Sequence, residues 1–195
     1  MAAHYENRVL RPLRVFTDGL VLDGLLNATL AGRTLDELNN SGRPMIALLS
    51  PRVMAGDWVV DEGSIVVNKA AIMMVAEIPD LGASLTGPHS EPELQKFGRA
   101  AVRMRLRSYN LEAYVVTSQG GDPLVRLSQG SHSFMALNNV KISGPGVDLS
   151  VPFLAVNRQH VLAGQELYSV NAVPEEVAAG SGDGLSCSRF NAGGS

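Results

Sequence analysis

One structural unit occurs twice in this chain of 195 residues. Residues 14–77 align with residues 103–166 at a constant offset of 89 positions without a gap, and ten of the 64 aligned pairs are identical. Residues 45–48 (Met-Ile-Ala-Leu), for example, match 134–137 (Phe-Met-Ala-Leu). Because the apolar pattern and the turn positions agree along the whole unit, we expect two copies of one small architecture.

Most of each unit has the alternation of a β-strand. In the second copy, Val102, Met104 and Leu106 alternate with Arg103, Arg105 and Arg107, which predicts a half-buried strand with the arginines on its outer face. In the first copy, strands are expected at residues 13–17, 20–26, 45–49, 52–54 with 58–60, 64–68 and 71–77. A tight turn is expected at Asp18-Gly19, and a hairpin turn joining the last two strands at Asn68-Lys69, repeated at Asn157-Arg158.

One short helix is expected in each unit. In residues 32–40, Thr34 is a candidate cap, Glu37 follows three residues later, and Leu35 and Leu38 share a face. Several short strands and one helical turn are too few for a sandwich but sufficient for a small barrel. The predicted fold class is therefore mostly β, with two tandem small barrels that each carry one short helix.

Composition suggests how the units are separated. The first barrel is expected in residues 1–78 and the second in residues 99–173. Residues 79–98 are rich in proline and glycine, as a linker would be, and residues 174–195 have the composition of a flexible tail.

The apolar and charged content is that of a soluble protein, with 45% hydrophobic and 18% charged residues and a net charge of −3. The longest apolar run, residues 70–76, is far shorter than the roughly 20 residues of a membrane helix, and the first residues do not resemble a secretory signal. The single cysteine, Cys187, cannot form a disulfide within one chain. We expect a cytoplasmic protein without membrane contact.

A search for catalytic or ligand-binding groups favours a protein that is not an enzyme. The four histidines are tens of residues apart, so no metal site is expected, and His160 is expected to be a solvated residue beside a turn. No glycine-rich stretch is followed by a helix of the kind that a phosphate-binding loop needs. Ser181, considered as a nucleophile, lies in the expected tail. The prediction is no catalytic residue, no metal and no cofactor.

The arginine strand admits two interpretations. Its side chains would project at intervals of about 6.5–7 Å, which is comparable with the spacing of nucleic-acid phosphates. With the turn residues Asn68, Lys69, Asn157 and Arg158, the three arginines are candidate contacts to RNA or DNA. The alternative is a charged, solvent-facing or edge strand that resists aggregation, and this alternative has the greater weight.

Residues 151–161 (Val-Pro-Phe-Leu-Ala-Val-Asn-Arg-Gln-His-Val) carry the most distinctive motif, and residues 65–72 are a degraded copy of it. With the strand pair and the Leu-x-x-Leu-Asn segment that ends at Asn39, this pattern resembles a bacterial family of uncharacterised Sm-like small-barrel proteins. The resemblance implies Sm-like or SH3-like barrels and association through edge strands. It also places the turns at Asn68-Lys69 and Asn157-Arg158 where RNA-binding Sm proteins have a short Arg-Gly turn.

The two units differ in charge. The first contains five basic and eight acidic residues, whereas the second contains six basic and four acidic residues. Opposite charges favour contact between unlike units, either within one chain or between copies. We therefore expect a non-enzymatic scaffold or assembly subunit, either a homo-oligomer or an intrachain pair of barrels. The alternative is a nucleic-acid-binding module.

Overall fold

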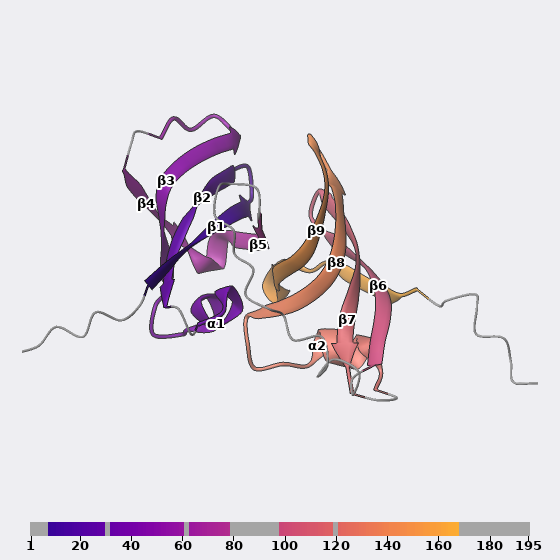
Figure 1. Ribbon diagram of the computed structural model, residues 1–195. Helices are drawn as coiled ribbons and strands as arrows, with labels where there is room; N and C mark the ends of the chain where they lie inside the picture. The colour runs from indigo at the N-terminus through magenta and orange to yellow at the C-terminus, as the bar shows by residue number, and fades with distance from the viewer. Residues whose placement is uncertain (1–7, 30–31, 61–62, 79–97, 119–120, 168–195) are drawn as a thin grey trace, which may run out of the picture.

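The computed structural model describes residues 8–29, 32–60, 63–78, 98–118 and 121–167 (Figure 1). The linker expected at 79–98 and the tail expected at 174–195 lie outside these residues, except for Gly98, which begins a strand. The first unit contains β1 (Arg8–Thr17), β2 (Val21–Thr29), α1 (Thr34–Asn39), β3 (Met45–Ala55), β4 (Ser64–Asn68), a 3₁₀ turn η1 (Lys69–Ala71) and β5 (Ile72–Glu77).

The second unit repeats this order of elements. It contains β6 (Gly98–Leu106), β7 (Tyr109–Thr117), α2 (Pro123–Ser128), β8 (Phe134–Gly144), β9 (Val147–Asn157), the 3₁₀ turn η3 (Arg158–His160) and β10 (Ala163–Glu166). Every strand pairing found in one unit has an equivalent in the other. The pairs Val15↔Val75 and Met104↔Gly164, for instance, differ by the same 89 positions.

All ten strands form one antiparallel sheet, in the order β10-β6-β7-β8-β9-β5-β1-β2-β3-β4. The mostly β class is therefore confirmed. The sheet is open, because β10 and β4 lie at its two ends in the described part of the chain. Figure 1 shows the strands of each unit curving around their own side of the molecule, with β5 and β9 meeting in the middle.

The long strands β3 and β8 each change direction at an equivalent residue. Ser50 and Asn139 have positive φ angles of 47° and 48°, and each lies beside a register shift against the preceding strand. Residues 45–55 therefore form one bent strand, and the break expected between 49 and 52 is such a bend. A bulge lets the strand curve without leaving the sheet.

Three local expectations were wrong. The strand expected to include residues 58–60 ends at Ala55, and residues 58–60 are not in a strand. Thr34 does not cap α1: Arg33 precedes the helix, Asp36 accepts a hydrogen bond from the Arg33 backbone, and Thr34 is buried with its hydroxyl donating to Glu77. Asn68-Lys69 does not close a hairpin either, because β4 pairs with β3 whereas β5 pairs with β1. The Asn68 side chain accepts from the amide of Ala70 and so holds a 3₁₀ turn, which sends the chain across the unit to a different strand.

The buried side chains form two clusters, and each cluster contains residues of both units. Phe134 and Ala155 of the second unit pack within the first cluster, with Val75 and Leu48. Phe16 and several other residues of the first unit pack within the second cluster; they are Val21, Met73, Met74 and Ala76. The two units therefore share apolar cores.

Candidate functional site

The junction between the two units, here called the seam, is made by β5 and β9. These strands pair over three positions: Met74↔Val156, Val75↔Ala155 and Ala76↔Leu154. At the central pair the larger Val75 lies opposite the small Ala155, and both side chains are fully buried. The seam thus continues the sheet with the packing of a protein interior.

Asn157 and His160 add polar contacts across the seam. Asn157 is buried, with 1% of its surface exposed, and its Nδ2 donates to the carbonyls of Ile72 at 3.0 Å and Lys69 at 3.3 Å. Its Oδ1 meanwhile accepts from the amide of Gln159 and holds η3. A ring nitrogen of His160 lies 2.8 Å from the carbonyl of Ala70, so this residue is not the purely solvated turn histidine expected.

Asn39, at the end of α1, binds the start of β8. Its Nδ2 donates to the Phe134 carbonyl at 3.0 Å, and its Oδ1 accepts from the Phe134 amide at 2.9 Å. Phe16 of β1 and Tyr109 of β7 form an edge-to-face aromatic pair, with ring centroids 5.7 Å apart. Both contacts join the first unit to the second.

An ion pair closes one end of the seam. Arg107 Nη1 donates to Asp18 Oδ2 at 2.6 Å, and these two residues occupy the same position of the repeat. Both side chains are at least half exposed, so the pair is solvated. Its contribution to stability is therefore small.

Lys69 and Arg158, two of the candidate nucleic-acid contacts, point into their own units. Lys69 Nζ donates to the carbonyls of Glu37 at 2.6 Å and Asn40 at 2.9 Å, at the end of α1. Arg158 Nη1 donates to the carbonyls of Arg126 and Leu127, at the end of α2. Burial lowers the pKa of both groups. Each side chain therefore satisfies carbonyls at a helix end.

The three arginines of the predicted basic strand all have partners in the chain. Arg103 pairs with Glu112 at 2.7 Å across β6 and β7, in the same way as Arg14 pairs with Asp23 in the first unit. Arg105 donates to Asn110, and Arg107 binds Asp18 as described. Arg103 and Arg105 are exposed on the outer face of β6, as the alternation predicts. Arg107 is also exposed, but it lies beyond the end of β6, in a turn with a φ angle of 44°.

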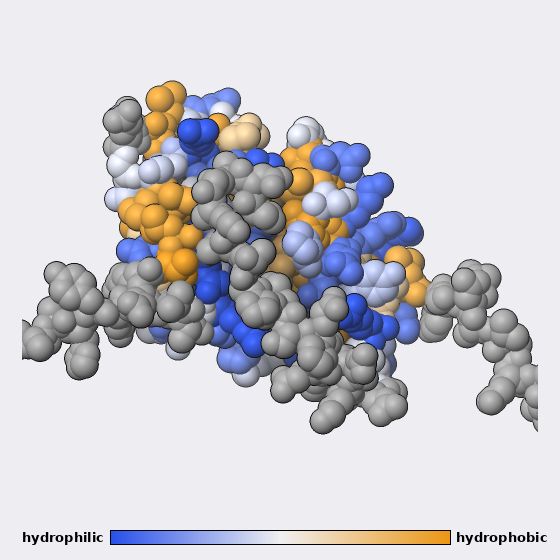
Figure 2. Space-filling view, in the orientation of Figure 1, coloured by the Kyte–Doolittle hydropathy of each residue, from blue (hydrophilic) through white to orange (hydrophobic). Residues whose placement is uncertain are grey.

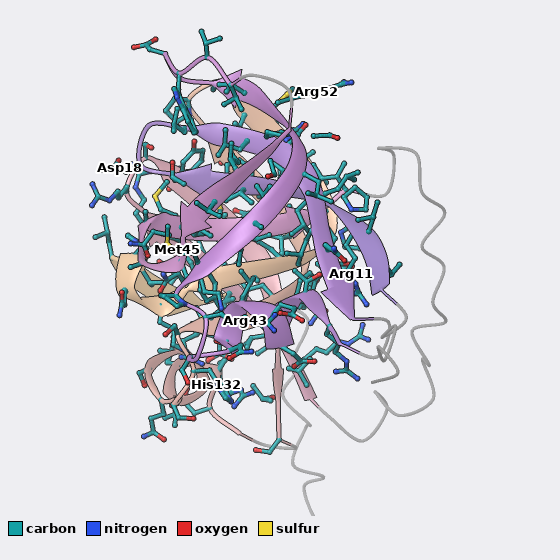
Figure 3. The ribbon with its side chains drawn as sticks, turned by 90° about the vertical axis from the view of Figure 1, so that its left-hand side faces the viewer. Arg11, Asp18, Arg43, Met45, Arg52 and His132 are labelled. Atoms are coloured by element: carbon teal, nitrogen blue, oxygen red, sulfur yellow. The ribbon has the colours of Figure 1, made fainter. Side chains whose placement is uncertain are left out.

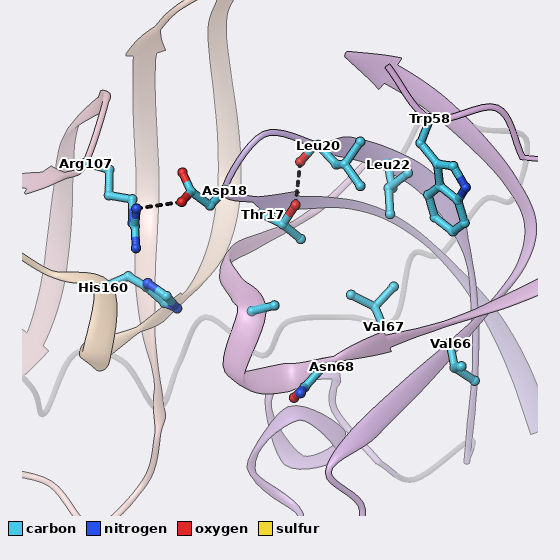
Figure 4. Close-up of a pocket in the computed structure, with 11 residues that line it drawn as sticks. Thr17, Asp18, Leu20, Leu22, Trp58, Val66, Val67, Asn68, Arg107 and His160 are labelled. Atoms are coloured by element: carbon cyan, nitrogen blue, oxygen red, sulfur yellow. Dashed lines mark hydrogen bonds and ion pairs between the residues drawn. The ribbon is translucent and has the colours of Figure 1, made fainter. Parts of the chain in front are cut away.

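An apolar pocket of about 350 Å³ lies between β4 and the Asp18–Arg107 end of the seam (Figure 4). Trp58, Val66, Leu20 and Leu22 line one part, and His160 with the ion pair lies at the other. Val66 is 64% exposed, although it lies in a strand. Figure 2 shows apolar surface over the β3–β4 side of the molecule, and Figure 3 looks onto this side, where Met45 is exposed.

A second, more polar hollow of about 420 Å³ follows the seam on the side of α1. Asn68, Lys69 and Asn157 meet here, so the two predicted turns are brought together. Lys69 and Asn157 are occupied by the contacts described above. Arg43 and His132, which were not among the candidate residues, also line it.

The described residues contain no cluster of three or more side chains that could hold a metal ion. No helix among them has the length and apolar character needed to cross a membrane. Comparisons with protein-family models, with curated proteins and with solved structures found no match.

Proposed function

We propose that this protein is a non-enzymatic assembly subunit of two Sm-like barrel units, and that its copies associate through the two ends of the sheet. The observation that carries this proposal is the asymmetry between the seam and these ends. Within the chain, β5 and β9 bury an apolar joint. The equivalent strands, β10 and β4, each have only one strand neighbour among the described residues.

The exposed side chains on β4 support the proposal. Phe134 and Ala155 are buried at the seam, but their equivalents Met45 and Val66 are 42% and 64% exposed. An edge strand with exposed apolar side chains is a template for another strand. The two end strands, β10 and β4, are the repeat equivalents of β5 and β9, which pair at the seam. Copies of the chain could therefore pair end to end in the same way, as the subunits of a repeating assembly do.

Sedimentation velocity at micromolar concentration tests this function. We expect a mass that is a multiple of the chain mass, and Val66→Lys should reduce it to a single chain, because the added charge would be buried in the joint. Val59→Lys is the matched control, since Val59 is 85% exposed and lies outside β4. A wild-type protein that stays a single chain would contradict the proposal.

Nucleic-acid binding is the second proposal, and the exposure of Arg103 and Arg105 on one face of β6, with the exposed Arg107 in the turn that follows, supports it. The same purified protein also tests nucleic-acid binding, because nucleic acid that co-purifies raises the ultraviolet absorbance of nucleic acid relative to that of protein. Salt-sensitive binding that is lost after reversal of the three charges would favour this alternative.

A further inference from the structure

We infer that copies join head to tail in one register, with β10 of one copy added to β4 of the next. We also infer that this order is fixed by positions of the repeat at which the two units carry different residue types. This inference rests on the proposed function, because it requires copies that associate through their sheet ends. The seam serves as the template: shifting its three pairs by the repeat offset places Ala163 opposite Val67, Gly164 opposite Val66 and Gln165 opposite Ile65.

Side-chain size is complementary in this register. At the seam the larger residue, Val75, lies on β5 and the small Ala155 lies on β9. At the two ends the sizes are reversed, with Gly164 on β10 and Val66 on β4. β5 and β9 already have a strand on each side, so the other joints open to a second copy are β4 with β4 and β10 with β10. Centred on the same residues, the first would oppose two Val66 side chains, and the second would leave a gap between two glycines. Only the joint of β10 with β4 reproduces the packing of the seam.

The surroundings of Gly164 support the same arrangement. A Cβ atom at position 164 would lie 3.3 Å from the Leu127 side chain and 3.9 Å from that of Met104. This position is therefore already crowded from within the second unit. A glycine here leaves room for the exposed Val66 of a neighbouring copy to pack on the partly exposed Leu127.

The charges at the repeat position shared by Asp18 and Arg107 act in the same direction. At the seam this position brings aspartate against arginine. In a joint between the second unit of one copy and the first unit of the next, Arg107 would keep the pair with its own Asp18 and would also lie near the Asp18 of the neighbouring copy. Joints between like units would oppose two aspartates or two arginines, which repel each other.

The apolar pocket has an occupant in this arrangement. Met73 is buried in the same cluster as Tyr109, Leu111 and Val156 of the second unit. The repeat equivalents of those three residues are Leu20, Leu22 and Val67, which line the pocket. The equivalent of Met73 is Leu162, which is 66% exposed beside β10. Leu162 of the copy that contributes β10 would therefore fill the pocket of the copy that contributes β4, in the position that Met73 has at the seam.

Asn68 completes the comparison. It is exposed and, among the described residues, makes only the capping bond to Ala70. Its equivalent, Asn157, caps η3 and also donates across the seam. In the joint between copies, Asn68 Nδ2 would donate to the carbonyls of Arg158 and Val161, the equivalents of those of Lys69 and Ile72.

A pair of substitutions tests the size rule. Gly164→Val should reduce association at least tenfold, because it opposes Val66 with a second valine. Adding Val66→Ala to the same chain recreates the Val–Ala pair of the seam and should restore association. Every chain of the double variant carries both substitutions, and the two residues meet between copies. If Gly164→Val acted only by damaging its own unit, Val66→Ala would not restore association, and the inference would be overturned.

Cross-linking tests the register. In a Cys187→Ser background, an Ile65→Cys chain and a Gln165→Cys chain should form an intermolecular disulfide when mixed and mildly oxidised. A Val59→Cys chain mixed with the Gln165→Cys chain is the control. Oligomers that form without this disulfide, and that tolerate Gly164→Val, would overturn the register while leaving the assembly function standing.

Two other outcomes are also decisive. A single chain at every concentration would remove both the register and the assembly function. A single chain that associates only after residues 168–195 are deleted would show that the chain's own C-terminal segment covers a sheet end, which would also overturn the inference.

Discussion

Asn68 and Asn157 show how one residue type acquires two roles at equivalent positions. Both side chains hold a 3₁₀ turn by accepting a backbone hydrogen bond. Only Asn157 is buried, and only Asn157 also donates to two carbonyls of the other unit. Its loss would remove both hydrogen bonds across the seam, although the Lys69 carbonyl would keep its bond from the Ile72 amide.

We therefore predict unequal effects of the two alanine substitutions. Asn157→Ala should lower the free energy of unfolding by about 2–3 kcal/mol, whereas Asn68→Ala should lower it by about 1 kcal/mol, the cost of a lost cap. Urea titrations in the Val66→Lys background would measure this without a contribution from association. Equal losses would mean that the contacts of Asn157 across the seam add nothing.

At the scale of elements, the sequence predicts the strands well because their signal is local. The alternation of Val102, Met104 and Leu106 with arginines matches the burial of β6 residue by residue. The seam has no such signal, because β5 and β9 are brought together by sequence-distant pairing. One contact of the seam could nevertheless have been predicted from the sequence, because Asp18 and Arg107 carry opposite charges at equivalent positions of the repeat.

The bends in β3 and β8 give a prediction for these strands. Ser50 has a φ angle of 47°, a conformation that glycine adopts freely and β-branched residues resist. Ser50→Val should lower the free energy of unfolding by about 1–3 kcal/mol, whereas Ser50→Gly should leave it nearly unchanged. Thermal unfolding followed by circular dichroism would measure both variants. A valine that is as well tolerated as glycine would argue against the bend.

For the whole molecule, the shared cores imply that the two units fold and unfold together. Phe134 and Ala155 complete the first cluster, and Phe16 and Met74 complete the second. If one unit unfolded, the apolar cluster of the other unit would be exposed to water where the missing residues had packed. The ten strands form one open sheet, so the expected pair of barrels is not confirmed, and we expect its two halves to depend on each other for stability.

The only tryptophan makes this dependence measurable, because Trp58 lies in the first unit and reports on it by fluorescence. Leu137 is fully buried in the second cluster, and Leu137→Ala should cost about 2–5 kcal/mol. If the halves unfold together, this substitution shifts the Trp58 transition and the circular-dichroism transition equally. Leu48→Ala, at the equivalent position of the first unit, should shift both in the same way. A Trp58 transition that stays in place after Leu137→Ala, beside a second transition in circular dichroism, would show that the units unfold independently.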